Sequence, residues 1–210
     1  MVRTYKVVRL PRSGWSWEDV PPASVDLNPW GAGGPLPPAE VRVALGGEAF
    51  LVRMRAWERP IRVAARSHNG VVWEDSCVEF FFNPAPAADR RYLNFEVNAE
   101  GVMLLGFGPD RHGRSLLDFD PGRFLISADV PPGKAAEWNK PYYTLRFDIP
   151  VAFLEELYGP IDLKPGAVMA GNFQKCGEKT PNPHYGVWNP ILTGKPDFHQ
   201  PDYFGRLILE

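Results

Sequence analysis

Cysteine and histidine are both scarce in this sequence, which has two cysteines and four histidines among 210 residues. Cys77 and Cys176 are too few for a disulfide framework, so we expect two reduced and mostly buried thiols. Neither the cysteines nor the histidines have the spacing of metal ligands. We therefore expect no transition-metal site and no cofactor. The possibility of a structural calcium ion stays open, because calcium sites built from aspartates and carbonyl oxygens in loops leave little trace in a sequence.

Long apolar runs and clusters of like charge are also missing. Lysine and arginine total 23, aspartate and glutamate total 25, and no basic tract indicates a nucleic-acid partner. The opening residues, MVRTYKVVRLPRSGWSW, contain no apolar run long enough for a secretory signal or a membrane span. We expect a cytoplasmic protein that binds neither nucleic acid nor a membrane. The sequence gives no expectation for the oligomeric state.

Proline and glycine are abundant, at 23 and 20 residues, which indicates many turns and few long helices. Segments in which apolar and polar residues alternate predict strands with one buried face. Residues 46–47, Gly-Gly, indicate a hairpin turn, and residues 151–158 form the one credible helix. The predicted strands are residues 5–10, 40–45, 49–57, 77–82, 92–98, 124–130, 142–149, 168–176 and 203–209.

This succession of strands and turns predicts an all-β fold, a two-sheet antiparallel β-sandwich of jelly-roll-like form with one short helix. No composition break divides the chain, so we expect a single domain over residues 1–210. Residues 1–39 would add an irregular strand and loop packed on that domain. Two sheets that bury their apolar faces against each other leave an outer face, or the loops at one end, for function.

The expected outer face of two neighbouring segments, 77–82 and 92–98, has an unusual composition. Where lysine, threonine and serine are usual, it has amides, carboxylates, a thiol and two aromatic rings. Trp73 stands at the loop boundary just before. Such groups suit a sugar, whose C–H face stacks on an aromatic ring and whose hydroxyls need donors and acceptors. A solvated sheet face would show the same pattern. The residues are Cys77, Glu79, Phe81, Tyr92, Asn94, Glu96 and Asn98.

Four motifs resemble the family 9 carbohydrate-binding modules, and in particular stand-alone family 9-like proteins of bacteria within the DOMON-type sandwich superfamily. They extend over nearly the whole chain from residue 40 to residue 210. The resemblance implies a β-sandwich that holds a sugar, often at its reducing end, between two aromatic rings with polar residues beneath. The motifs are VVWEDSCVEFFF, YLNFEVNAEGVMLLGFG, GNFQKCG and the terminal W-N-P…F-H-x-P-x-Y-F-G-R-L.

By this resemblance the two rings would be Trp73 and Phe198, and the acid after the first ring would be Glu79. Glu96, in FEVN, stands where the sugar-binding members carry a basic residue. The charge at that position is therefore reversed. The residues that could restore a cation are Lys175, Arg111 and Arg114.

Further candidates to line the site are two amides and a tryptophan, Asn172, Asn189 and Trp188, of which Trp188 suits the core equally well. Asn94, Asn98 and Asn172 could instead tie loops through bonds from side chain to backbone. The segments DSCVEFF and NFQKC could pair as neighbouring strands and bring Cys77 and Cys176 together, as thiols or as a disulfide.

Two other functions remain open beside sugar binding. Glu79 and Glu96 on adjacent strands could be the carboxylate pair of a glycan-acting enzyme, although such pairs more often bind a cation, accept hydroxyls or are solvated. The superfamily also includes haem-binding redox sandwiches, which would require Met54, Met103 or Met169 to meet a histidine. The leading hypothesis is non-catalytic binding of a mono- or oligosaccharide.

Overall fold

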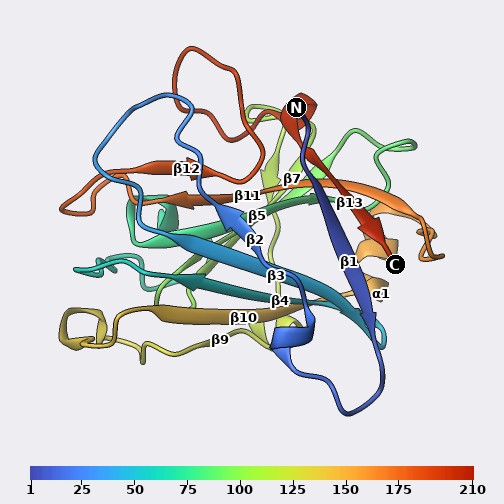
Figure 1. Ribbon diagram of the computed structural model, residues 1–210, viewed down its shortest axis with the longest axis horizontal. Coiled ribbons are helices and arrows are strands. Elements are labelled where there is room, and N and C mark those ends of the chain that lie inside the picture. Colours follow the sequence, from blue (N-terminus) through green and yellow to red (C-terminus); the bar gives the residue numbers. More distant parts are fainter.

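The computed structural model describes residues 1–210, and its strands form two sheets packed face to face (Figure 1). The first sheet has the strand order β8-β7-β6-β5-β11-β13-β1, with β12 paired to β11. Its strands are β1 (Thr4–Leu10), β5 (Cys77–Asn83), β6 (Tyr92–Asn98), β7 (Met103–Gly108), β8 (Ser115–Leu116), β11 (Val168–Cys176), β12 (Tyr185–Val187) and β13 (Gly205–Leu209).

The second sheet has the order β1-β3-β4-β10-β9, with β2 paired to β3. Its further strands are β2 (Ala23–Val25), β3 (Ala39–Gly46), β4 (Ala49–Ala56), β9 (Ser127–Ala128) and β10 (Tyr143–Pro150). The helices are α1 (Val151–Tyr158) and the short 3-10 turns η1 (Trp17–Asp19), η2 (Val72–Glu74), η3 (Pro121–Phe124), η4 (Ala135–Glu137) and η5 (Pro201–Tyr203). None of them combines the length and the apolar character that a membrane crossing requires.

Strand β1 belongs to both sheets and joins them along one edge. Its first half pairs in parallel with β13, where Thr4 lies opposite Arg206, and its second half pairs in parallel with β3, where Val8 lies opposite Ala44. The other strand pairs are antiparallel. The predicted all-β sandwich with one α-helix is confirmed, and β1 adds parallel pairing to its antiparallel sheets.

The apolar faces of the two sheets form a core of 36 buried residues. Alternation decides which side chains enter it, so β3 directs Val43 inward while β5 directs Phe80 and Phe82 inward. The ring of Phe80 lies between those of Phe82 and Phe173, with centroids 5.0 and 4.9 Å away. These side chains fix the relative position of the sheets, and so of the outer face of β5.

The predicted elements agree with the observed ones where the alternation is regular. The bounds of α1 and β11 match the prediction, and the β3–β4 hairpin turns at residues 47–48, with φ of 61° at Gly47, one position later than expected. The strand predicted at residues 124–130 is wrong. Phe124 ends η3 and Leu125 adopts a left-handed φ of 46°, so only Ser127–Ala128 pairs with β10.

A second apolar layer covers the outer face of the first sheet, where the sequence led us to expect open polar groups. It contains 11 buried residues, among them Phe81 and Tyr92 on the strands and Phe198 and Phe204 on the covering loop. In Figure 1 the blue N-terminal loop and the red C-terminal loop arch over the sheet together. Trp30 joins them, because its indole Nε1 donates to Thr193 Oγ1 over 3.0 Å. These two loops therefore cover the outer face of β5, β6 and β11, and we call them the roof of the first sheet.

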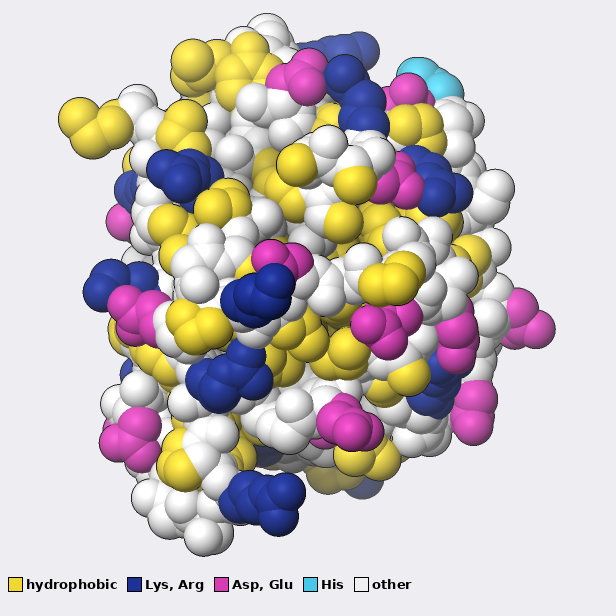
Figure 2. Space-filling view, turned by 90° about the vertical axis from the view of Figure 1, so that its right-hand side faces the viewer, with side chains coloured by type: hydrophobic (Ala, Val, Ile, Leu, Met, Phe, Trp, Pro, Cys, Tyr) yellow, Lys and Arg dark blue, Asp and Glu magenta, His cyan; other side chains and the backbone are white.

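The end of the sandwich at the right of Figure 1, where α1 and the C-terminus lie, has a mixed surface. Figure 2 shows basic and acidic side chains interspersed there with apolar ones, so neither sign of charge dominates this face. Lys6 pairs with Glu210 and Arg123 pairs with Glu156, each over 2.6 Å. Such exposed pairs contribute about 0–1 kcal/mol each, and the stability of the fold depends on its core.

Replacing Phe80 by alanine should lower the free energy of unfolding by about 3–5 kcal/mol, because it removes a fully buried ring and leaves a cavity. Urea denaturation measures this change. Leu192→Ala is the control, since that side chain is 73% exposed and its loss should cost no more than about 0.5 kcal/mol. A loss below about 1 kcal/mol for Phe80→Ala would contradict the packing described above.

Candidate functional site

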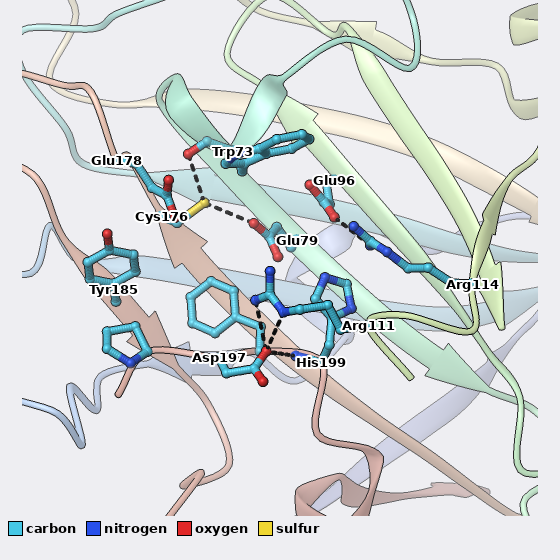
Figure 3. A pocket seen from close by; sticks show the side chains of 12 residues that line it. Trp73, Glu79, Glu96, Arg111, Arg114, Cys176, Glu178, Tyr185, Asp197 and His199 are labelled. Carbon is cyan, nitrogen blue, oxygen red and sulfur yellow. Dashed lines mark hydrogen bonds and ion pairs between the residues drawn. The ribbon is translucent and has the colours of Figure 1, made fainter. Parts of the chain in front are cut away.

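A pocket of about 190 Å³ lies between the outer face of the first sheet and the loops that cover it (Figure 3). Its floor is formed by Glu79 of β5, Glu96 of β6 and Cys176 of β11. The volume is below the roughly 300–1,000 Å³ of sites for drug-sized ligands. The pocket therefore suits a ligand with a single ring inside.

Two aromatic side chains that the sequence singled out, Trp73 and Phe198, both line this pocket. Trp73 belongs to η2, and its carbonyl oxygen accepts a bond from the backbone N–H of Glu178 (3.2 Å) and lies 3.4 Å from Cys176 Sγ. Phe198 is almost buried, and its ring lies 5.8 Å from that of Trp30, which limits its movement. Rings on two different loops are thus held at one cavity.

Asp75 anchors the loop that carries Trp73. Its buried carboxylate accepts bonds from the backbone N–H groups of Ala64 (2.9 Å) and Ala65 (3.0 Å) and from Asn98 Nδ2 (3.0 Å), and it pairs with Arg62. A buried carboxylate is stable only when it is fully partnered in this way. The network ties residues 62–76 to β6 and sets the position of the indole two residues earlier.

Glu79 and Glu96 lie directly opposite each other on β5 and β6, and each is only 2% exposed. Cys176 Sγ donates to Glu79 Oε1 over 2.9 Å, while Asn94 Nδ2 donates to Glu96 Oε1 over 2.9 Å. Burial raises the pKa of Glu79 well above its usual value, and Cys176 and Glu96 raise it further. Burial also raises the pKa of Glu96 to about 7, although Arg114 opposes this. At neutral pH the pair therefore retains at least one proton.

Two arginines from the segment between β7 and β8 bring positive charge into the pocket. Arg114 Nη1 lies 3.5 Å from Glu96 Oε1, and Arg111 Nη2 lies 2.8 Å from Asp197 Oδ1. Burial raises the pKa of Asp197, but hydrogen bonds from Gln200 and Arg111 outweigh it and leave that pKa below its usual value. A cation thus faces Glu96. The sequence offered Lys175, Arg111 and Arg114 as sources of this positive charge, and both arginines line the pocket.

His199 contributes a neutral imidazole opposite Trp73. Figure 3 shows Trp73 on one side of the two glutamates, with His199 and Asp197 on the other. Burial lowers the pKa of His199 to about 3, with Arg114 and Arg111 adding to the effect. Its Nδ1 lies 2.8 Å from the Tyr92 hydroxyl, which orients the ring. His199 can therefore offer a hydrogen bond without a charge.

The asparagines named from the sequence lie next to the pocket but do not line it. Asn94 lies beneath and orients Glu96, as described above. Asn98 belongs to the Asp75 anchor, and it also donates to the Ala65 carbonyl oxygen over 3.1 Å. The side chain of Asn172 accepts from the backbone N–H of Asn189 (2.8 Å) and donates to its carbonyl oxygen (2.9 Å). Asn98 and Asn172 thus tie loops to the sheet, the alternative that the sequence left open.

Lys175 and Trp188 lie on the other side of the first sheet, away from the pocket. Alternation along β11 turns Lys175 toward the core side, where its Nζ contacts Glu58 Oε2 (2.7 Å) and His184 Nε2 (2.8 Å). Its charge is therefore satisfied away from Glu96. Trp188 belongs to the main core and packs on Phe173, with ring centroids 5.3 Å apart. The proposal that these two side chains line the site is corrected by this geometry.

The pocket also contains residues that sequence reasoning did not assign to the site. They are Cys176, Glu178, Tyr185, Pro196, Asp197 and His199. Tyr185 on β12 and Asp197 on the loop reach it only because the C-terminal segment folds back over β11.

The structure gives no support for a haem site, because the methionines that would have to bind the iron are inside the main core. Those methionines are Met54, Met103 and Met169.

Comparison with known proteins gives one family and one fold. Residues 16–209 match the sequence profile described as carbohydrate-binding family 9, whereas no curated protein matches the chain. The solved structure of a candidate carbohydrate-binding protein from Bacteroides uniformis ATCC 8492 is 28% identical over 100% of both chains, with a TM-score of 0.84. A family 9 module from Caldicellulosiruptor kristjanssonii, solved with glucose and with cellotriose, gives TM-scores of 0.62 and 0.61 at 14% and 15% identity. These matches cover 99% of this chain and 96% and 94% of the module.

Glu96 should make the stability of the protein depend on pH. Its pKa is about 7 in the folded chain, against 4.5 for an ordinary glutamate, so between these values the folded state binds more protons than the unfolded state. This contribution is present in full at low pH and is lost as the pH rises from 4.5 to 7, on the order of 3 kcal/mol in all. Urea denaturation of wild type and Glu96→Gln across this range tests it. The variant should show the smaller decline, and parallel curves would contradict the assignment.

Proposed function

Because this chain belongs to carbohydrate-binding family 9, we propose that it binds a carbohydrate without catalysis and that the pocket between Trp73 and Phe198 is its sugar site. The family assignment agrees with the resemblance found in the motifs. The observation that carries the proposal is the joint presence of two aromatic side chains and two buried carboxyl groups around one cavity of ring size.

The proposed contacts follow from the chemistry of a sugar ring. Its C–H face would stack on the half-buried indole of Trp73, with Phe198 contributing apolar surface from another part of the wall. Its hydroxyl groups would donate to Glu96 and exchange hydrogen bonds with Glu79 and His199. Bonds to a charged partner are the stronger ones, so Glu96 and Arg111 would set the orientation of the ring.

The size of the pocket limits what it can hold. At about 190 Å³ it has room for one sugar ring, and any further ring would extend past the loops into solvent. The family 9 module of C. kristjanssonii was solved with glucose and with cellotriose, so these two sugars are the first probes to use. We expect the trisaccharide to gain little over the single ring, because only one ring is enclosed.

Glycan hydrolysis is a second candidate, favoured only by the position of Glu79 opposite Glu96. An acid and a base flanking a glycosidic bond have this general arrangement. The family assignment favours binding instead. Incubation with aryl glycosides should therefore release no aryl group, and release that is lost in Glu79→Gln and in Glu96→Gln would establish the enzyme.

Replacing Trp73 by alanine should weaken sugar binding at least tenfold, which is about 1.4 kcal/mol, because the stacking surface is removed. Phe198→Ala should weaken it in the same direction. Isothermal titration calorimetry with glucose and cellotriose measures both effects, and circular dichroism confirms that the fold is intact.

Trp57→Ala is the matched control, because this indole is 36% exposed and does not line the pocket. Its affinity should equal that of the wild type. Sugar affinity unchanged in Trp73→Ala would rule out this pocket, and a wild-type protein that binds no sugar in a broad glycan screen would rule out the function.

A further inference from the structure

The two free cysteines and Glu79 meet at the floor of the pocket, although they lie far apart in the sequence. Cys77 and Cys176 occupy directly opposed positions on the antiparallel strands β5 and β11. Glu79 lies two residues beyond Cys77 on the same face of β5. Both sulfur atoms and a carboxylate oxygen lie within 4.8 Å of one another. The pairing of these two strands, one of the readings that the sequence left open, is confirmed, and both cysteines are free thiols. The sequence gave no sign that Glu79 would join them.

These three side chains are buried and have few other partners. Cys77 Sγ contacts the Cys176 thiol and makes one long contact of 3.8 Å to the Val78 carbonyl oxygen. Cys176 Sγ contacts Glu79 and the carbonyl oxygen of Trp73, and no lysine or arginine forms an ion pair with Glu79. A neutral thiol tolerates such burial, but a carboxyl group with so few partners is costly unless a ligand satisfies it. A divalent cation would satisfy all three at once.

The donor set also matches the chemistry of one class of metal. Thiolate sulfur and carboxylate oxygen are both ligands of Zn²⁺, which favours four ligands in a tetrahedral arrangement. Three ligands from the protein and one open position is the pattern of zinc sites that accept water or substrate. Glu79 and Cys176 both line the cavity, so the fourth position would face the space into which a pocket ligand enters.

We propose that Cys77, Glu79 and Cys176 form a binding site for a divalent cation of the zinc class, with its fourth coordination position directed into the pocket. On binding, the two thiols and the carboxyl group of Glu79 release their protons to solvent, and no electron is transferred. The fourth position takes a water molecule or a hydroxyl group of the pocket ligand. The metal site does not depend on sugar binding.

Cobalt titration tests the proposal, because Co²⁺ occupies zinc sites and absorbs light. Reduced, metal-free protein with both thiols intact should take up one Co²⁺ per chain. It should then show the thiolate-to-cobalt charge-transfer band in the near ultraviolet, together with the visible bands of a tetrahedral site. Addition of Zn²⁺ should abolish these bands. A titration with no saturable charge-transfer band would overturn the proposal.

Variants assign the ligands. Cys77→Ser and Cys176→Ser should each reduce the charge-transfer band strongly, and Glu79→Gln should weaken Co²⁺ affinity at least tenfold. Glu74→Gln, a carboxylate paired with Lys179 outside the pocket, should bind Co²⁺ as the wild type does. Unchanged bands in both serine variants would overturn the assignment.

X-ray absorption of the zinc-loaded wild type keeps the test valid even if a cysteine variant fails to fold. The proposal requires two sulfur scatterers at about 2.3 Å from zinc. A shell of oxygen and nitrogen alone would contradict it.

Discussion

The burial of two carboxyl groups side by side is the constraint on which this site depends. Glu79 and Glu96 face the same side of adjacent strands with 2% exposure each. Two negative charges cannot remain so close together without water to screen them, so one carboxyl group keeps its proton. Glu96 is the one partnered by Asn94 and Arg114. In such a dry environment a hydrogen bond to a ligand hydroxyl is stronger than it would be in water. Burial of the two carboxyl groups lowers the stability of the folded chain, but it also strengthens the hydrogen bonds that they can make to a polar ring in the pocket.

The roof over the first sheet creates this environment, and it depends on contacts between distant parts of the chain. Asp75 and Asn98 fasten the loop of Trp73 to β6, and Trp30 fastens the C-terminal loop through Thr193. A sandwich needs only one core, between its sheets. The second apolar layer of 11 residues is an addition that serves to hold these loops down. The binding side chains thus lie on loops, but the loops have a rigid base.

Much of the fold could be predicted because alternation is a local property. The pattern in 92–98 placed Glu96 on the face opposite the core, and the family motifs pointed to Trp73 and Phe198. Alternation along β11 places Lys175 on the same face as the core residue Phe173, but the sequence gave no indication of a buried Glu58 to receive its charge. Asp197 and Tyr185 reach the pocket through the folding back of the C-terminal segment, and Cys176 reaches it through the pairing of β11 with β5. No short-range pattern in the sequence encodes contacts between such distant segments. For the same reason the approach of Cys77 to Cys176 was only one of the readings that the sequence allowed.

Nuclear magnetic resonance of the tryptophan indole N–H groups, recorded while a sugar is titrated, tests the central claim most directly. The chain has seven tryptophans, and they occupy distinct environments: Trp73 at the pocket, Trp188 in the core and Trp57 exposed. The account predicts a saturable shift of the Trp73 indole signal, with backbone amide shifts centred on Glu79 and Glu96, while Trp188 and Trp57 stay unchanged. A saturable shift elsewhere, with Trp73 unaffected, would contradict it.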